Sequence, residues 1–73
     1  MNDKLFKIIA SVLEMDVKEV NEDFSESSSE KWDSLAQLMM MEEIETEFKV
    51  NIPIEDVMEL TSVKRILEFL EHK

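Results

Sequence analysis

Apolar residues recur at helical spacing in one segment near each end of the chain. The first stripe consists of Leu5, Ile8, Ile9, Val12 and Leu13. The last consists of Val63, Ile66, Leu67 and Leu70. Apolar positions repeating at intervals of three and four residues line one face of an α-helix. The pattern therefore predicts amphipathic helices over residues 3 to about 14 and 63 to about 71.

A third long helix is predicted over residues 34–48, and its two faces differ. The face that we expect in the core holds Gln37, Met40, Met41, Ile44 and Phe48. The opposite side holds Leu35, Leu38, Met39, Glu42, Glu45 and Thr46. Exposed leucine and methionine bordered by acids are typical of a docking surface. The alternative is that a small bundle buries this helix on both sides.

Residues 15–32 have no helical periodicity and predict a long loop. Four spaced apolar residues are expected to anchor it to the core: Met15, Val17, Val20 and Phe24. A loop of this length is uncommon in a compact domain and is often functional. Its serines and glutamates at residues 25–30 favour a solvated segment, with phosphorylation as the alternative.

Beyond residue 48 the chain predicts one short helix before the last long one. Asn51 is expected to end the preceding helix in a left-handed conformation, and the residue before Pro53 should be extended. The short helix covers residues 54–60, and its inward face is expected to consist of Ile54, Val57 and Met58. Residues 61–62 should cap the last helix. The fold class is all-α: a small four-helix bundle of three long helices and one short, with a long loop between helices 1 and 2, in one domain spanning residues 1–73.

Composition narrows the chemistry that such a bundle can perform. The chain has no cysteine and no glycine, and its single histidine is His72. These absences exclude disulfides, thiolate metal sites and a glycine-rich phosphate loop, and they remove the usual general base. No apolar run approaches a membrane span, and no signal peptide is visible, so we expect a cytoplasmic protein. A net charge of −10 disfavours nucleic acid as a partner and favours basic protein surfaces.

Asp33 and Ser34 stand where the polar loop meets the second helix. Asp33 is expected to be the N-cap, which places Ser34 in the first helical turn and open to solvent. A serine in this position is either a capping residue or an attachment point. The sequence provides it with no base of the kind that activates a nucleophile, so we do not expect an enzyme. The acidic clusters lack the spacing of a calcium loop, so we expect no metal site.

Four short motifs at matching distances resemble the acyl carrier protein family. They are Asp33-Ser34-Leu35, Glu45-Thr46-Glu47-Phe48, Ile52-Pro53 and Thr61-Ser62-Val63, and the similarity covers nearly the whole chain. The resemblance implies that a phosphopantetheinyl transferase attaches 4′-phosphopantetheine from coenzyme A to Ser34, with Asp33 as its partner in recognition. It implies that the arm ends in a thiol that holds acyl groups as thioesters.

The resemblance also implies roles for further residues. It implies that the carrier docks to the basic surfaces of acyl-loading and acyl-transferring enzymes through Leu35, Leu38, Met39, Glu42 and Glu45. A gap that shelters an acyl chain would be lined by Gln37, Met40, Met41, Ile44, Val57, Met58 and Leu60. The expected protein is a monomeric carrier for fatty-acid or specialised acyl and polyketide-type biosynthesis.

The chain departs from the pattern of fatty-acid carriers near the serine. Residues 28–32 replace a glycine-containing segment, while Ala36 and Met39 stand at frequently acidic positions. These departures favour a specialised, stand-alone carrier. The alternatives are a peptidyl or D-alanyl carrier loaded by an adenylating ligase and, from another class, an acidic adaptor without a prosthetic group.

Overall fold

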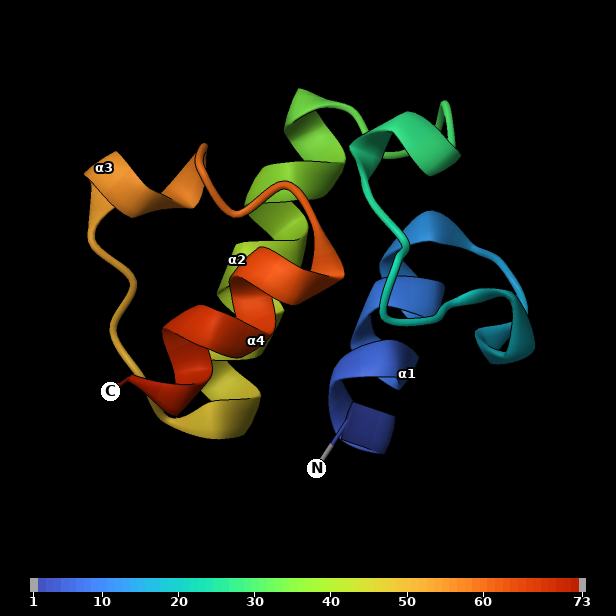
Figure 1. The fold of residues 1–73 in the computed structure, drawn as a ribbon. Helices are drawn as coiled ribbons and strands as arrows, with labels where there is room; N and C mark the ends of the chain where they lie inside the picture. The colour runs from blue at the N-terminus through green and yellow to red at the C-terminus, as the bar shows by residue number, and fades with distance from the viewer. Residues whose placement is uncertain (1, 73) are drawn as a thin grey trace.

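The computed structural model describes residues 2–72 as a small bundle of helices (Figure 1). The long helices are α1 (Asn2–Leu13), α2 (Ser34–Phe48) and α4 (Val63–Glu71), and the short one is α3 (Ile54–Val57). Helix α1 packs against α2, and α2 packs against α3. This architecture confirms the predicted fold class. None of the helices within residues 2–72 is long and apolar enough to cross a bilayer.

The predicted apolar stripes meet in one core. Its fully buried members from the long helices are Leu5, Ile9, Leu13, Met40, Ile44, Val63 and Ile66. On α2 the buried side also includes Gln37 and Met41, as predicted, whereas the Phe48 ring is half-buried. Because three stripes from distant parts of the sequence share this core, the start of α2 is held in a defined position.

The loop between α1 and α2 is fixed at both of its ends and in its middle. It contains two short 3-10 turns, η1 (Val17–Glu19) and η2 (Glu26–Ser28). Val20 and Phe24 are buried and Met15 is half-buried, so these anchors are confirmed, but the prediction for Val17 is wrong because it is exposed. Val17 begins η1, and this turn buries none of its residues.

Backbone pairing ties the same loop to the start of α4. The Val63 N–H donates to the Phe24 carbonyl at 2.9 Å, and the Glu26 N–H donates to the Thr61 carbonyl at 3.0 Å. Between them Ser25 and Ser62 form an isolated antiparallel bridge. Ser62 also caps α4 by accepting the Arg65 N–H, as predicted. The pairing brings the loop before α2 against the junction of α3 and α4.

Two helices end in the left-handed conformation without a glycine. Among the described residues, positive φ angles occur at Glu14 (56°) and Lys49 (55°), each directly after the last helical residue. The Val50 N–H then reaches back to the Glu45 carbonyl at 3.2 Å, closing α2. The prediction that Asn51 ends this helix is therefore wrong. The left-handed residue must follow Phe48 immediately, whatever its type, so that the next N–H can satisfy a free carbonyl.

Helix α3 is shorter than predicted, and its inward face differs. It covers Ile54–Val57, while Met58 follows in a turn. Ile54 is 85% exposed and Met58 54% exposed, so their placement on the inward face is wrong, whereas Val57 is half-buried. A single helical turn has room for only one inward position, and Ile52 and Leu60 on either side of it supply the buried contacts.

Candidate functional site

Ser34 is the first residue of α2, and the turn that begins there is well capped. Asp33 has an extended backbone, and its carboxylate Oδ1 accepts the Ala36 N–H at 2.9 Å. The Asp33 carbonyl accepts the Gln37 N–H at 2.8 Å. These bonds confirm the predicted cap. They hold the exposed Ser34 side chain at the positive end of a helix of 15 residues.

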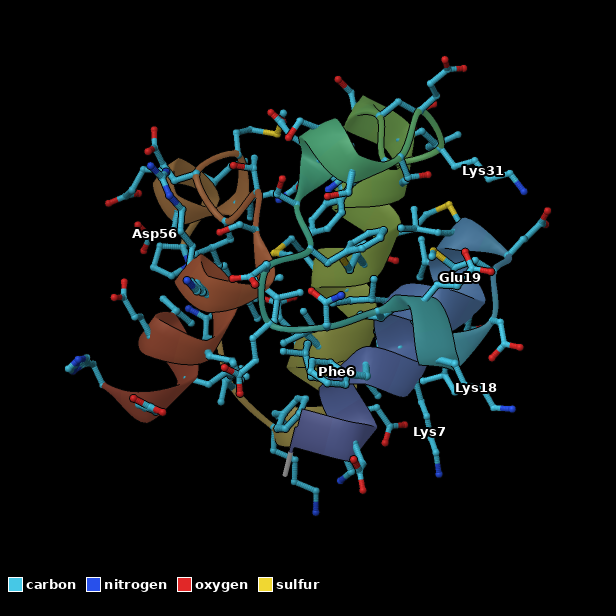
Figure 2. The ribbon with its side chains drawn as sticks, turned by 45° about the vertical axis from the view of Figure 1, so that its right-hand side comes forward. Phe6, Lys7, Lys18, Glu19, Lys31 and Asp56 are labelled. Carbon is cyan, nitrogen blue, oxygen red and sulfur yellow. The ribbon has the colours of Figure 1, made fainter. Side chains whose placement is uncertain are left out.

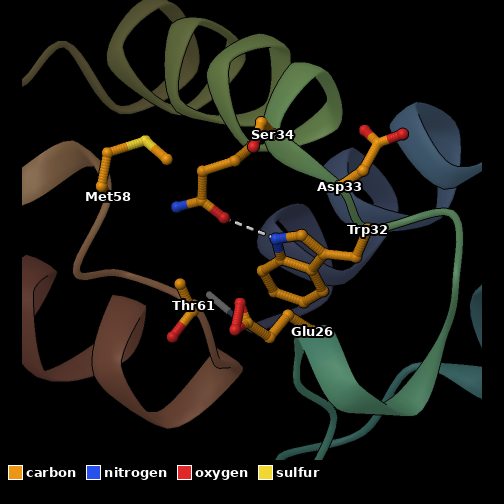
Figure 3. Close-up of a pocket in the computed structure, with 7 residues that line it drawn as sticks. Glu26, Trp32, Asp33, Ser34, Met58 and Thr61 are labelled. Carbon is orange, nitrogen blue, oxygen red and sulfur yellow. Dashed lines mark hydrogen bonds between the residues drawn. The ribbon is translucent and has the colours of Figure 1, made fainter.

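The backbone on either side of Ser34 is anchored by a buried pair, Trp32 and Gln37. The indole N–H of Trp32 donates to Gln37 Oε1, as the dashed line in Figure 3 shows. The Trp32 ring also stacks on Phe24, with ring centroids 6.0 Å apart and planes inclined by 23°. In the sequence the exposed serine therefore lies between two buried residues whose side chains are hydrogen-bonded to each other.

Gln37 also joins α2 to the segment after α3. Its amide Nε2 donates to the Val57 carbonyl at 2.6 Å and to the Leu60 carbonyl at 2.8 Å. The side chain is only 3% exposed, so these bonds satisfy an amide that would otherwise be costly to bury. This bridge spans the space between α2 and α3.

A hollow of about 400 Å³ opens beside Ser34. It is lined by Glu26, Trp32, Asp33, Ser34, Gln37, Met58 and Thr61 (Figure 3). The lining comes from η2, the start of α2 and the junction of α3 and α4, which the backbone pairing described above holds together. Its walls combine apolar and hydrogen-bonding groups, as the walls of ligand-binding hollows commonly do.

The predicted docking residues lie on the open side of α2. Leu35, Leu38 and Met39 are 66%, 51% and 46% exposed, so the alternative of burial on both sides is wrong. Glu42 is exposed, but Glu45 is half-buried, and its Oε2 accepts the Ile52 N–H at 2.8 Å. One carboxylate of this set therefore also anchors the chain that leads to α3.

Charge is distributed unevenly around the bundle. The sequence of α2 contains Glu42, Glu43, Glu45 and Glu47 and no basic residue. In Figure 2, Lys7, Lys18 and Lys31 extend outward on the side of α1 and the long loop, with Glu19 among them, whereas Asp56 of α3 lies on the other side. Within α2 the exposed apolar side chains therefore have only acidic charged neighbours, while Lys4 and Lys7 of α1 lie beside Glu43 and Glu47.

The seven residues predicted to line an acyl gap are divided between two hollows and the core. Gln37 and Met58 line the hollow beside Ser34. Met41 and Val57 line a second hollow of about 270 Å³ between α2 and α3, together with Leu38, Glu42, Glu45, Ile52 and Ile54. The remaining three, Met40, Ile44 and Leu60, are buried. Their role toward a cargo stays a prediction.

Sequence reasoning did not identify the wall of the hollow formed by Glu26, Trp32 and Thr61. The sequence did contain a signal for Trp32. Gln37 stands in an otherwise apolar core stripe, and a buried glutamine needs a hydrogen-bond partner. Trp32, five residues before Gln37, carries the only indole in the chain. Glu26 and Thr61 gave no such signal, since their approach depends on the pairing of distant loops.

The local structure fits a phosphodiester on Ser34. Ser34 is exposed, and the first turn of α2 contains no acidic residue; the carboxylate of the N-cap Asp33 is bonded to the Ala36 N–H. An anion at a helix N-terminus is stabilised by the macrodipole and by the backbone N–H groups of the first turn. The adjoining hollow provides space next to Ser34.

Comparison with known families agrees with this geometry. The family model described as "Phosphopantetheine attachment site" matches residues 3–70. Domains of this kind are carriers to which 4′-phosphopantetheine is covalently attached, and they are not themselves catalytic. Since the match covers nearly the whole chain, the protein belongs to the phosphopantetheine attachment-site family and is a phosphopantetheine-carrying carrier protein.

Proposed function

We propose that Ser34 is the residue to which the phosphopantetheine arm is attached. In this reaction the Ser34 hydroxyl oxygen forms a bond to the phosphorus of the phosphopantetheine portion of coenzyme A. The pyrophosphate bond breaks and adenosine 3′,5′-bisphosphate leaves, while the hydroxyl proton passes to a base of the transferring enzyme. The carrier itself supplies the oxygen and its position.

The observation that carries this proposal is the exposed Ser34 hydroxyl at the first position of α2, beside the hollow lined by Trp32 and Gln37. Six other serines occur in the chain. Ser62 caps α4, and Ser25 and Ser28 bond to one another within η2. Ser34 combines exposure, the start of a long helix and an adjoining hollow.

The arm supplies a terminal thiol that holds an acyl group as a thioester, a chemistry that a chain without cysteine does not have by itself. The cargo that we propose is an acyl group for fatty-acid or specialised biosynthesis. The role of Asp33 is to keep the first turn of α2 in place through its bond to Ala36.

We propose the open side of α2 as the surface that meets the partner enzymes. Two features support this: the exposed side chains of Leu35, Leu38 and Met39, and the acidic residues of the same helix. An acidic surface with an apolar centre is complementary to a basic one, and charge complementarity speeds encounter. The partners are a phosphopantetheinyl transferase and enzymes that load or remove the cargo.

Intact-mass measurement after incubation with coenzyme A and a promiscuous phosphopantetheinyl transferase tests the attachment site. We expect the wild type and Ser11→Ala, a control at an exposed serine of α1, to gain the mass of one phosphopantetheinyl group. Ser34→Ala should gain none. No gain in the wild type, or an equal gain in Ser34→Ala, would refute the proposal.

A further inference from the structure

The hydrogen bond between Trp32 and Gln37 joins two defined positions at the start of α2. Asp33 is the N-cap, so Trp32 is the residue before the cap and Gln37 is the fourth residue of the helix. Residues at these two positions often pack together as a hydrophobic staple, which fixes the angle at which the chain enters the helix. Here a buried indole N–H donates to a buried amide oxygen instead. Helix α2 thus begins with a staple whose contact is a hydrogen bond.

The amide of Gln37 has one orientation that satisfies its partners. Its Nε2 donates to the carbonyls of Val57 and Leu60 at 2.6 and 2.8 Å. Reversing the amide would turn its oxygen toward these carbonyls and its N–H groups toward the indole N–H, so all three bonds would be lost. The acceptor of the staple is therefore fixed in the direction of Trp32.

The donor of the staple is fixed from the loop. The backbone N–H of Trp32 donates to the Ser29 carbonyl at 3.2 Å, and its ring stacks on Phe24. The Phe24 carbonyl in turn accepts the N–H of Val63, the first residue of α4. The entry of the chain into α2 is thus tied to α4 through the loop.

We infer that Trp32 is a positioning residue for the modification of Ser34, acting through its hydrogen bond to Gln37. This inference rests on the proposed attachment of the arm to Ser34 and on the proposed docking surface of α2. Ser34 and Leu38 are four residues apart, so they lie on the same face, about one turn from each other, as long as the first turn is helical. A transferase docked on Leu38 then meets the Ser34 oxygen at one place.

Without the indole N–H the first turn of α2 opens more often. The first four N–H groups of a helix have no acceptor within the helix, and the Asp33 carboxylate supplies one to Ala36 alone. When this turn opens, the Ser34 oxygen moves, while Leu38 in the second turn stays in place. Docking is preserved and the transfer step is slowed, because misplacing the reacting atoms by about 1 Å can cost about a hundredfold in rate.

Steady-state kinetics of phosphopantetheine transfer separates docking from positioning. Coenzyme A is held at saturation, the carrier concentration is varied, and intact mass follows the product. In Trp32→Phe, which keeps an aromatic ring without a donor, we expect kcat to fall by about tenfold and KM to stay within about twofold of the wild type. The control is Ile66→Val, which shortens a fully buried side chain of α4 and should leave both constants within about twofold.

Hydrogen exchange of backbone amides, followed by NMR, gives a readout that does not involve the transferase. The N–H groups of Ala36 and Gln37 bond to Asp33 in the first turn. They should exchange about tenfold faster in Trp32→Phe than in the wild type, because local opening of this turn no longer has to break the staple. In Ile66→Val their exchange should be unchanged.

The possible failures are distinguishable. Absence of any mass gain in the wild type would refute the attachment of the arm, and the inference with it. A modified Trp32→Phe with the kcat of the wild type, or with a higher KM alone, would overturn the positioning role only. So would an equal fall of kcat in Ile66→Val, which would assign the effect to lost stability. If far-UV circular dichroism shows that Trp32→Phe is unfolded, benzothienylalanine replaces Trp32, because its ring has nearly the same shape with a sulfur atom in place of the N–H, and the same results are expected.

Discussion

The indole N–H of Trp32 donates a hydrogen bond to the side-chain carbonyl of Gln37, and the two residues enclose Ser34 in the sequence. The bond crosses the boundary between the long loop and α2. It places the last loop residues against the helix whose first turn carries the exposed serine. The geometry of the site therefore depends on a contact in the core and not only on the local cap.

We predict that Trp32→Phe lowers the free energy of unfolding by about 2 kcal/mol, because it leaves the buried Gln37 Oε1 without a donor and removes part of a buried ring. Urea denaturation followed by far-UV circular dichroism measures this, since the only tryptophan is lost. In a double-mutant cycle with Gln37→Leu, the double variant should be less destabilised than the sum of the single ones by about 1 kcal/mol. Additive effects would contradict the coupling.

The charge of Asp33 and its capping function can be separated by mutation. Asp33→Ala removes the acceptor of the Ala36 N–H and should lower the free energy of unfolding by about 1 kcal/mol. Asparagine caps helices as well as aspartate does, so Asp33→Asn should stay within about 0.5 kcal/mol of the wild type. Equal losses in both variants, measured by urea denaturation, would show that the carboxylate acts through its charge instead.

Helix α2 and its cap could be predicted because their signals are local. The apolar stripe has helical spacing, and Asp33 is a strong N-cap directly before it, so the predicted bounds agree with Ser34–Phe48. The exposure of Leu35, Leu38 and Met39 followed from the same periodicity. A stripe shows which residues share a face, and one face of a helix in a small bundle must meet the core.

The contacts that shape the hollow could not be predicted in the same way. Thr61 and Glu26 approach each other through backbone pairing of two loops, which has no periodic pattern in the sequence. Ile54 and Met58 were misplaced because a one-turn helix has too few residues for its orientation to be read from spacing. Tertiary packing around Ile52 and Leu60 decides that orientation.

The left-handed residue after α2 gives a prediction on stability. Lys49 adopts φ 55° and ψ 47°, a region in which a side chain with a β-carbon is strained and glycine is not. Lys49→Gly should raise the free energy of unfolding by about 1 kcal/mol, because the relief of strain exceeds the added entropy of the unfolded chain. Denaturant unfolding measures the change.

Asn51→Gly is the matched control for this prediction. Asn51 does not have a positive φ among the described residues, so glycine there should stabilise nothing and should lower stability by a few tenths of a kcal/mol or more, since it only adds unfolded-state entropy. A stabilising Asn51→Gly together with a neutral Lys49→Gly would contradict the position of the helix end.

The docking surface that we propose on α2 predicts a defect in recognition that leaves the fold intact. Leu38 is 51% exposed and also lines the hollow beside Val57. In the proposed complex Leu38 is buried against the partner, so Leu38→Glu would place there a charge that has to be desolvated. We expect kcat/KM of the phosphopantetheinyl transferase for this variant to fall by about tenfold or more, the loss typical of a central interface residue.

Val17→Glu provides the control, because Val17 is an exposed apolar residue of η1, away from α2. It adds the same charge to the chain, so it should leave kcat/KM within about twofold of the wild type if the effect of Leu38→Glu is local. Raising the salt concentration should lower kcat/KM of the wild type and of Val17→Glu alike, since an acidic surface steers encounter with a basic enzyme. Equal losses in the two variants would assign the effect to net charge and would remove Leu38 from the docking surface.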